Sequence, residues 1–274
     1  MSIEMKEAGI QNVKKLRYID CDVHPFVEKI DRLFPYMTVG WKNRFALQGI
    51  NIGSLRLPDR YAHPAGGTLR IDATPPSGGR PGSDPEFVCR HYLDPYDPVA
   101  VVLNPLQPAG LAAWSDVDAV NALVAAFNEY YINEWLPLDE RYKYALVVTP
   151  QDPQHAAAEI RRLGGNKGVV AVFLSLMNIL MGNKHYHPIY EASIEMGLPV
   201  ITHVSGTECS YHGVPVVAGG SPSSYIERYV DLIQVAQSNV SSLIFEGIFE
   251  KYPSLRVGFV EHGFSWLLAL TWRM

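Results

Sequence analysis

The sequence predicts an α/β fold in which a parallel sheet is built from repeated β/α units. Short runs rich in Val, Ile and Leu alternate with longer helical patterns. These runs carry few interspersed polar residues, which is typical of strands buried on both faces of a parallel sheet. The chain of 274 residues is also within the range in which an α/β barrel forms one unit. We therefore expect residues 1–274 to form a single domain whose sheet is closed as a barrel or open.

Six apolar runs predict the strands, and the segments between them predict the helices. In chain order, the strands are expected at Leu16–Val23, Val99–Leu103, Tyr144–Val148, Val169–Leu174, Leu198–Val204 and Leu255–Glu261. The helices are expected at Asp116–Trp135, Pro153–Leu163, His187–Met196 and Ser223–Tyr252, the last in one or two pieces. Ser115 or Asp116 can cap the first helix, and Pro153 suits a first helical turn.

The segment between the first two strands breaks this rhythm. Residues 58–98 contain HPAGG, TPPSGGRPGSDP and DPYDP, which are dense in Pro and Gly. A connection of this length is usually a lid or binding loop, or else is disordered. We expect an ordered lid near the carboxyl end of the first strand, with partial disorder as the alternative.

Composition excludes several classes of protein. The net charge of −5 and the lack of any basic run argue against a nucleic-acid or anionic-membrane partner. The three cysteines lie far apart in the sequence, at Cys21, Cys89 and Cys209, and do not suggest a disulfide framework. No stretch reaches the roughly 18 uninterrupted apolar residues of a membrane span, and the first residues lack the apolar core of a signal peptide. We expect a cytoplasmic protein.

Polar side chains occur where the predicted strands end. In YIDCDVHP, Asp20, Asp22 and His24 stand at every second position, so they share one face of the first strand. His203 and His262 close two later apolar runs, and the carboxyl ends of barrel strands converge on one mouth. Mixed imidazole and carboxylate ligands suit zinc, manganese or iron. The pattern predicts a metal site, with Asp20 supporting the ligands through hydrogen bonds.

Several motifs resemble one family along nearly the whole chain. IDCDVHP, LNPL, VVTPQDP, HPIYEASIEMGLPVITH and LIFEGIFEKYPSLRVGFVEHGFSWLLALTWRM resemble the amidohydrolase superfamily. The resemblance is greatest to the amidohydrolase-related family that includes aminocarboxymuconate-semialdehyde decarboxylase and the resorcylate-type decarboxylases. It implies a TIM-like (β/α) barrel in which Asp22 and His24 match two first-strand metal ligands, with Asp replacing the first His. His203 matches the fifth-strand ligand, and His262 the catalytic histidine of strand six.

Two departures from the family pattern affect the expected site. The family's last ligand, an Asp after strand eight, has no counterpart, so strands seven and eight are expected to be missing from this chain. This implies a truncated or split version, or a site with one carboxylate fewer. The fourth strand reads VVAVFLSL and lacks the Lys or Glu that bridges two metals in relatives. We therefore expect one divalent ion, zinc or manganese, and association with a second copy or with a chain supplying the missing strands.

The resemblance implies an enzyme acting on a small organic substrate, whose binding residues the sequence does not identify. A metal-dependent hydrolase using a metal-activated water is the first expectation. A non-oxidative decarboxylase of a small aromatic or unsaturated carboxylic acid is the alternative, and an inactive relative acting as a subunit is the second alternative. Glu261, next to His262, is expected to face away from the site and to pair with a helix residue, because side chains alternate along a strand.

Overall fold

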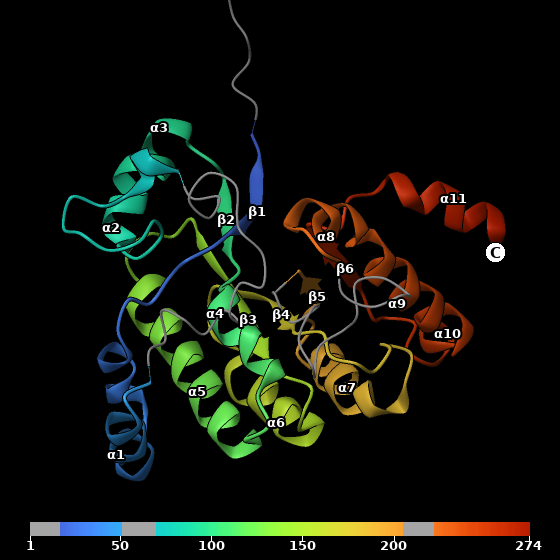
Figure 1. Ribbon diagram of the computed structural model, residues 1–274, viewed down its shortest axis with the longest axis horizontal. Coiled ribbons are helices and arrows are strands. Elements are labelled where there is room, and N and C mark those ends of the chain that lie inside the picture. The colour runs from blue at the N-terminus through green and yellow to red at the C-terminus, as the bar shows by residue number, and fades with distance from the viewer. Residues whose placement is uncertain (1–16, 51–69, 205–221) are drawn as a thin grey trace, which may run out of the picture.

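The structure is a computed structural model that describes residues 17–50, 70–204 and 222–274. Six parallel strands form one sheet in the order in which they occur along the chain (Figure 1). They are β1 (Ile19–Val23), β2 (Ala100–Leu103), β3 (Tyr142–Val148), β4 (Val169–Leu174), β5 (Val200–His203) and β6 (Val257–Val260). The predicted parallel sheet of α/β type is confirmed, and β4 begins and ends where the apolar pattern places it.

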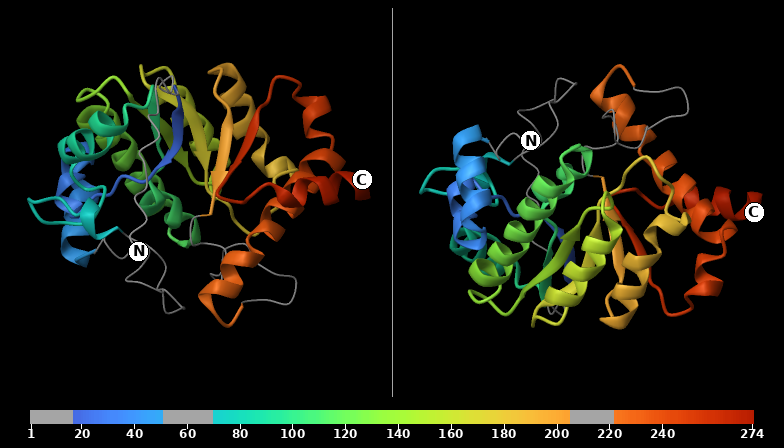
Figure 2. Two further views of the ribbon diagram at one scale, coloured as in Figure 1. Left: turned by 90° about the horizontal axis from the view of Figure 1, so that it is seen from above. Right: turned by 90° about the horizontal axis from the view of Figure 1, so that it is seen from below.

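The sheet curls, so the fold is a partial TIM-like α/β barrel. Each pairing joins consecutive strands, from Ile19 opposite Ala100 in β1 and β2 to His203 opposite Val260 in β5 and β6. Figure 2 shows the strands side by side in this order, with helices along one side of the sheet. The curl brings the carboxyl ends of β1, β5 and β6 toward one another, although β1 and β5 are separated by three strands in the sheet.

Helices follow most strands, as the β/α pattern predicts. They are α1 (Val39–Gln48), α2 (Pro85–Val88), α3 (Asp94–Tyr96), α4 (Leu106–Ala109), α5 (Val117–Tyr130), α6 (Pro153–Leu163), α7 (His187–Glu195), α8 (Tyr225–Asp231), α9 (Ile233–Phe245), α10 (Ile248–Lys251) and α11 (Ser265–Arg273). Asp116 caps α5 by accepting a hydrogen bond from the Ala119 amide. The predicted helix at Ser223–Tyr252 is divided into three. Within the described ranges, no helix is long and apolar enough to cross a membrane.

The outer face of the sheet is held to its helices by apolar packing and one buried amide. Asn128 of α5 is fully buried. Its Nδ2 donates to the Val147 carbonyl at 3.0 Å, and its Oδ1 accepts from the Tyr144 hydroxyl at 2.7 Å and the Val147 amide at 3.1 Å. Both ends of this amide are therefore occupied, and they fasten α5 to β3.

The structure does not confirm the predicted lid at residues 58–98. Residues 58–69 lie outside the described residues. Farther along, the Pro85 carbonyl accepts a hydrogen bond from the Tyr142 hydroxyl at 2.8 Å, and the Leu93 carbonyl accepts one from the Arg141 guanidinium at 2.9 Å. Tyr142 is the first residue of β3. Pro85 and Leu93 therefore pack at the amino-terminal end of the sheet, whereas Gly82 lies beside the chain that follows β1, where its carbonyl accepts a hydrogen bond from the Phe26 amide at 2.8 Å.

Candidate metal centre

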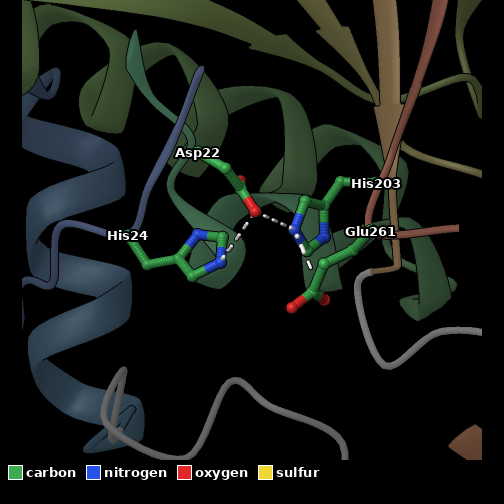
Figure 3. A group of neighbouring side chains, drawn as sticks. All are labelled: Asp22, His24, His203 and Glu261. Atoms are coloured by element: carbon green, nitrogen blue, oxygen red, sulfur yellow. Dashed lines mark hydrogen bonds and ion pairs between the residues drawn. The ribbon is translucent and has the colours of Figure 1, made fainter. Parts of the chain in front are cut away.

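Four side chains meet at the carboxyl ends of the strands: Asp22, His24, His203 and Glu261 (Figure 3). Each offers one ligand atom, and these atoms all lie within 4.8 Å of one another. Asp22 Oδ2 lies 3.3 Å from His203 Nε2 and 3.8 Å from His24 Nε2. Glu261 Oε2 lies 3.6 Å from His203 Nε2. The predicted ligands Asp22, His24 and His203 are thus brought together from β1 and β5.

The end of β1 is shaped by its neighbours. Asp20 does not belong to the four-residue group, but its Oδ1 accepts a hydrogen bond from the Asp22 amide at 3.0 Å. Its Oδ2 accepts another from the Tyr92 hydroxyl at 2.5 Å. The pairing of β1 with β2 shifts register between Asp20 and Val23. Asp20 therefore supports the bend of the strand that carries Asp22.

Both histidines of the group use Nδ1 for a backbone hydrogen bond. His24 Nδ1 lies 2.9 Å from the carbonyl oxygen of Asn104, and His203 Nδ1 is bonded to the carbonyl of Val204. A carbonyl only accepts, so each Nδ1 carries the proton and donates it. In the neutral rings this leaves the Nε2 lone pairs directed at the other members of the group. That is the tautomer that an imidazole needs to bind a metal through Nε2.

The electrostatics of the group favour positive charge at its centre. Burial acts to raise the pKa of Asp22, but the hydrogen bond and charge of His203, the charge of His24 and the bond from Asn104 together hold that pKa below its usual value. Burial acts to lower the pKa of His203, yet Asp22 and Glu261 raise it above its usual value. The two carboxylates outweigh the effect of burial on this ring, so His203 lies in a negative local potential.

Glu261 is a site residue that the sequence interpretation placed wrongly. It was expected to face away from His203 and to pair with a helix, but its carboxylate joins the group. The physical reason lies in the backbone: β6 ends at Val260, and Glu261 has a φ of 64°, in the left-handed region. Strand alternation therefore stops one residue earlier than the apolar pattern suggests. Such a conformation in a residue other than glycine is often found at functional sites.

His262 is buried next to the group without being one of its four members. Its Nδ1–H donates to the Val260 carbonyl at 2.8 Å, and its ring meets that of Phe259 edge to face at 5.8 Å between centroids. Its own carbonyl accepts a hydrogen bond from the Trp266 indole at 2.8 Å. These contacts fix the ring, and its catalytic role stays a prediction.

The donor set fits a divalent metal ion. Two imidazole nitrogens and two carboxylate oxygens from Asp22, His24, His203 and Glu261 are the ligands that zinc and manganese accept in proteins. The two carboxylates balance the charge of such an ion, and the same two groups raise the pKa of His203. Without a cation or a proton, two carboxylates this close to each other would repel.

Comparison with known proteins assigns the chain to a family. The Amidohydrolase family model matches residues 19–274, and the chain belongs to this family. Membership makes it an enzyme of the hydrolase or carboxy-lyase type and confirms the resemblance inferred from the strand-end motifs. A comparison with curated proteins found no match.

Solved structures share the fold at low sequence identity. An amidohydrolase from Mycobacterium avium subsp. paratuberculosis K-10 is 19% identical, with a TM-score of 0.63 over 94% of this chain and 76% of that chain. A 5-carboxyvanillate decarboxylase from Novosphingobium aromaticivorans DSM 12444, with bound manganese, is 19% identical, with a TM-score of 0.61 over 94% and 70% of the two chains. A 2,6-dihydroxybenzoate decarboxylase from Rhizobium is 16% identical, with a TM-score of 0.56 over 70% and 60%.

Replacing Glu261 with glutamine should weaken Mn²⁺ binding by at least about 10-fold, a loss typical of altered metal sites. The amide keeps the size of the side chain but removes one of the two negative charges in the group. Isothermal titration of the metal-free protein with MnCl₂ measures the change. Glu246→Gln is the matched control, because this exposed carboxylate at the end of α9 is not in the group. Equal affinities for the Glu261 variant and the unmodified chain would remove Glu261 from the ligand set.

Proposed function

We propose that this enzyme is a metal-dependent, non-oxidative decarboxylase of a small carboxylic acid. In this proposal Asp22, His24, His203 and Glu261 hold one divalent ion, with manganese preferred over zinc. The observation that carries the proposal is the presence of two carboxylates among the four donors. The fold neighbours named as decarboxylases, one of them with bound manganese, support the same class of reaction.

The charge of the two carboxylate ligands favours decarboxylation over hydrolysis at such a site. A bound divalent ion supplies Lewis acidity toward the carboxylate and a neighbouring oxygen of the substrate. Two anionic ligands bring the site close to neutral, so an anionic substrate enters without facing a net negative charge. The same two ligands reduce the positive charge available to activate water. This donor set therefore suits an acid substrate better than hydrolysis of a neutral amide or ester.

Loss of carbon dioxide requires a proton donor near the reacting carbon. The bond from that carbon to the carboxylate breaks, its electron pair stays on the carbon, and a proton must replace the carboxylate. We assign this donation to His262, whose Nδ1–H is engaged by the Val260 carbonyl. Nε2 is then the nitrogen that would carry the transferred proton, and solvent would reprotonate it after each turnover.

Metal-dependent hydrolysis, which the sequence analysis ranks first, is the second candidate function here. The family includes both hydrolases and decarboxylases. Incubating the Mn²⁺-loaded enzyme with hydroxybenzoic acids, including 5-carboxyvanillate and 2,6-dihydroxybenzoate, should release CO₂. In D₂O the product should gain one deuterium at the vacated carbon, detectable by mass spectrometry. Turnover of lactones, esters or amides with no CO₂ from any acid would instead identify a hydrolase.

Association with another chain also remains part of the proposal. Helix α11 and the residue before it present apolar side chains to solvent, with Phe264 85%, Leu268 72% and Trp272 90% exposed. Large exposed apolar patches on monomers often mark interaction surfaces. This surface supports an assembly of the chain with a second copy or with a chain that completes the barrel.

A further inference from the structure

We propose that Asn104 is a positioning residue that aims both first-strand ligands, Asp22 and His24, at a single metal ion. The inference rests on the proposed metal site and adds a residue from β2 to it. Asn104 follows the last residue of β2 and is fully buried. Its amide N–H donates to the Val23 carbonyl at 2.7 Å, which fixes it beside the end of β1.

Asn104 contacts both ligands through different atoms. Its side-chain Nδ2 donates to Asp22 Oδ1 at 2.9 Å and to the Cys21 carbonyl at 2.8 Å. Its backbone oxygen accepts the hydrogen bond from His24 Nδ1 at 2.9 Å. Because Asp22 Oδ1 and the Cys21 carbonyl are both acceptors, the nitrogen of the Asn104 amide must face them.

These contacts decide which atom each ligand offers. With Oδ1 of Asp22 held by Asn104, the other carboxylate oxygen, Oδ2, is the one near His24 and His203. Asp22 should therefore bind a metal through one oxygen. With Nδ1 of His24 held by the backbone of Asn104, Nε2 is left as the ligand atom. One residue thus orients a carboxylate and selects an imidazole tautomer, as partners of metal ligands do.

A comparison with Asn128 separates this role from a purely structural one. Asn128 uses both ends of its amide to join α5 to β3. In Asn104, Oδ1 is buried without a hydrogen-bond partner among the described residues. A buried acceptor left unpaired costs stability, so fold stability alone does not account for an amide at this position. The bond to Asp22 does account for it.

The test is the Mn²⁺ affinity of Asn104→Leu, which removes the amide and roughly preserves the volume. We expect the affinity to fall by about 10- to 100-fold, the usual loss when a partner of a metal ligand is removed. Freed from Asn104, the Asp22 carboxylate can bind through both oxygens. Co²⁺ loaded in place of Mn²⁺ should then show a weaker visible d–d band, as expected of a higher coordination number.

Asn128→Leu is the matched control, since it also removes a buried, hydrogen-bonded amide. It should lower the melting temperature while leaving the Mn²⁺ affinity and the Co²⁺ spectrum unchanged. If Asn104→Leu binds Mn²⁺ as tightly as the unmodified chain, the positioning role is wrong and the metal site stands. If the unmodified chain binds no Mn²⁺ or Co²⁺, the proposed function fails and the inference fails with it.

A second measurement on the unmodified chain does not depend on how the variant folds. The ¹⁵N shifts of His24 in the metal-free protein, at a pH where the ring is neutral, report which nitrogen carries the proton. The hydrogen bond to the Asn104 backbone predicts the Nδ1–H tautomer. A ring protonated at Nε2 would overturn this half of the inference.

Discussion

Replacing His203 with alanine should abolish both metal binding and turnover. His203 is fully buried, and its Nε2 lies within 3.6 Å of carboxylate oxygens of both Asp22 and Glu261. Its loss removes one of the proposed ligands and leaves two carboxylates without the imidazole between them. The fall in Mn²⁺ affinity should exceed the roughly 10- to 100-fold cost of losing a mere partner of a ligand. Titration with MnCl₂ and metal analysis of the purified variant measure it.

The control for this substitution is His155→Ala, because His155 is an exposed residue of α6 outside the group. It should retain both metal and activity. Treating the unmodified enzyme with a chelator should reproduce the inactivity of His203→Ala, and added Mn²⁺ should restore activity only in the unmodified chain. A variant that is folded by circular dichroism and keeps its metal would show that His203 is not a ligand.

The sequence predicts strands and helices best where an element is continuously buried or begins with a clear local signal. The run VVAVFL is buried along nearly its whole length and forms β4 as predicted, and Pro153 opens α6 as its fixed φ favours. The predicted helix at Ser223–Tyr252 shows the limit of this approach. A break near Leu232 and a positive φ of 68° at Gly247 divide it into α8, α9 and α10. The break at Gly247 reflects the glycine's conformational freedom.

The residues of the candidate site also differ in how far the sequence predicts them. Asp22 and His203 lie near the carboxyl ends of β1 and β5, and His24 follows β1 directly, so the convergence of strand ends suffices to group them. Glu261 depends on a left-handed backbone conformation that alternation does not encode. Asn104, in the weak motif LNPL, acquires its place only through the register of β2 against β1. Residues that depend on tertiary contacts of this kind have no local signal in the sequence.

The packing of the Pro/Gly-rich segment at residues 58–98 also depends on tertiary contacts that the local sequence does not encode. Its composition predicts turns, and the described part does contain short helical turns at Ile71–Ala73, Pro85–Val88 and Asp94–Tyr96. Composition does not say which end of the sheet they pack against. That is decided by long-range contacts, such as the bonds that Tyr142 and Arg141 donate to Pro85 and Leu93. Such contacts place Pro85 and Leu93 at the amino-terminal end of the sheet and Gly82 beside the chain that follows β1.

Replacing His262 with asparagine should abolish turnover while leaving metal binding nearly unchanged. The nitrogen of an asparagine amide can take the place of His262 Nδ1 and still donate to the Val260 carbonyl, so the local backbone is preserved. The amide has no group equivalent to Nε2 that can carry a proton near neutral pH. Loss of a general acid costs about 100- to 10,000-fold in rate. CO₂ release and Mn²⁺ titration on the same preparation measure the two effects.

Comparison with His203→Ala makes this result specific to proton transfer. His262 lies outside the four-residue group, whereas His203 lies within it, so only the latter variant should lose its metal. His91→Asn, which changes an exposed histidine stacked on Phe87, is the control for the chemical substitution and should keep full activity. Equal metal loss in the His262 and His203 variants would make His262 a ligand. Full turnover by His262→Asn would assign the proton to another group, with Glu261 the first to test because its carboxylate is the most exposed of the group's acids.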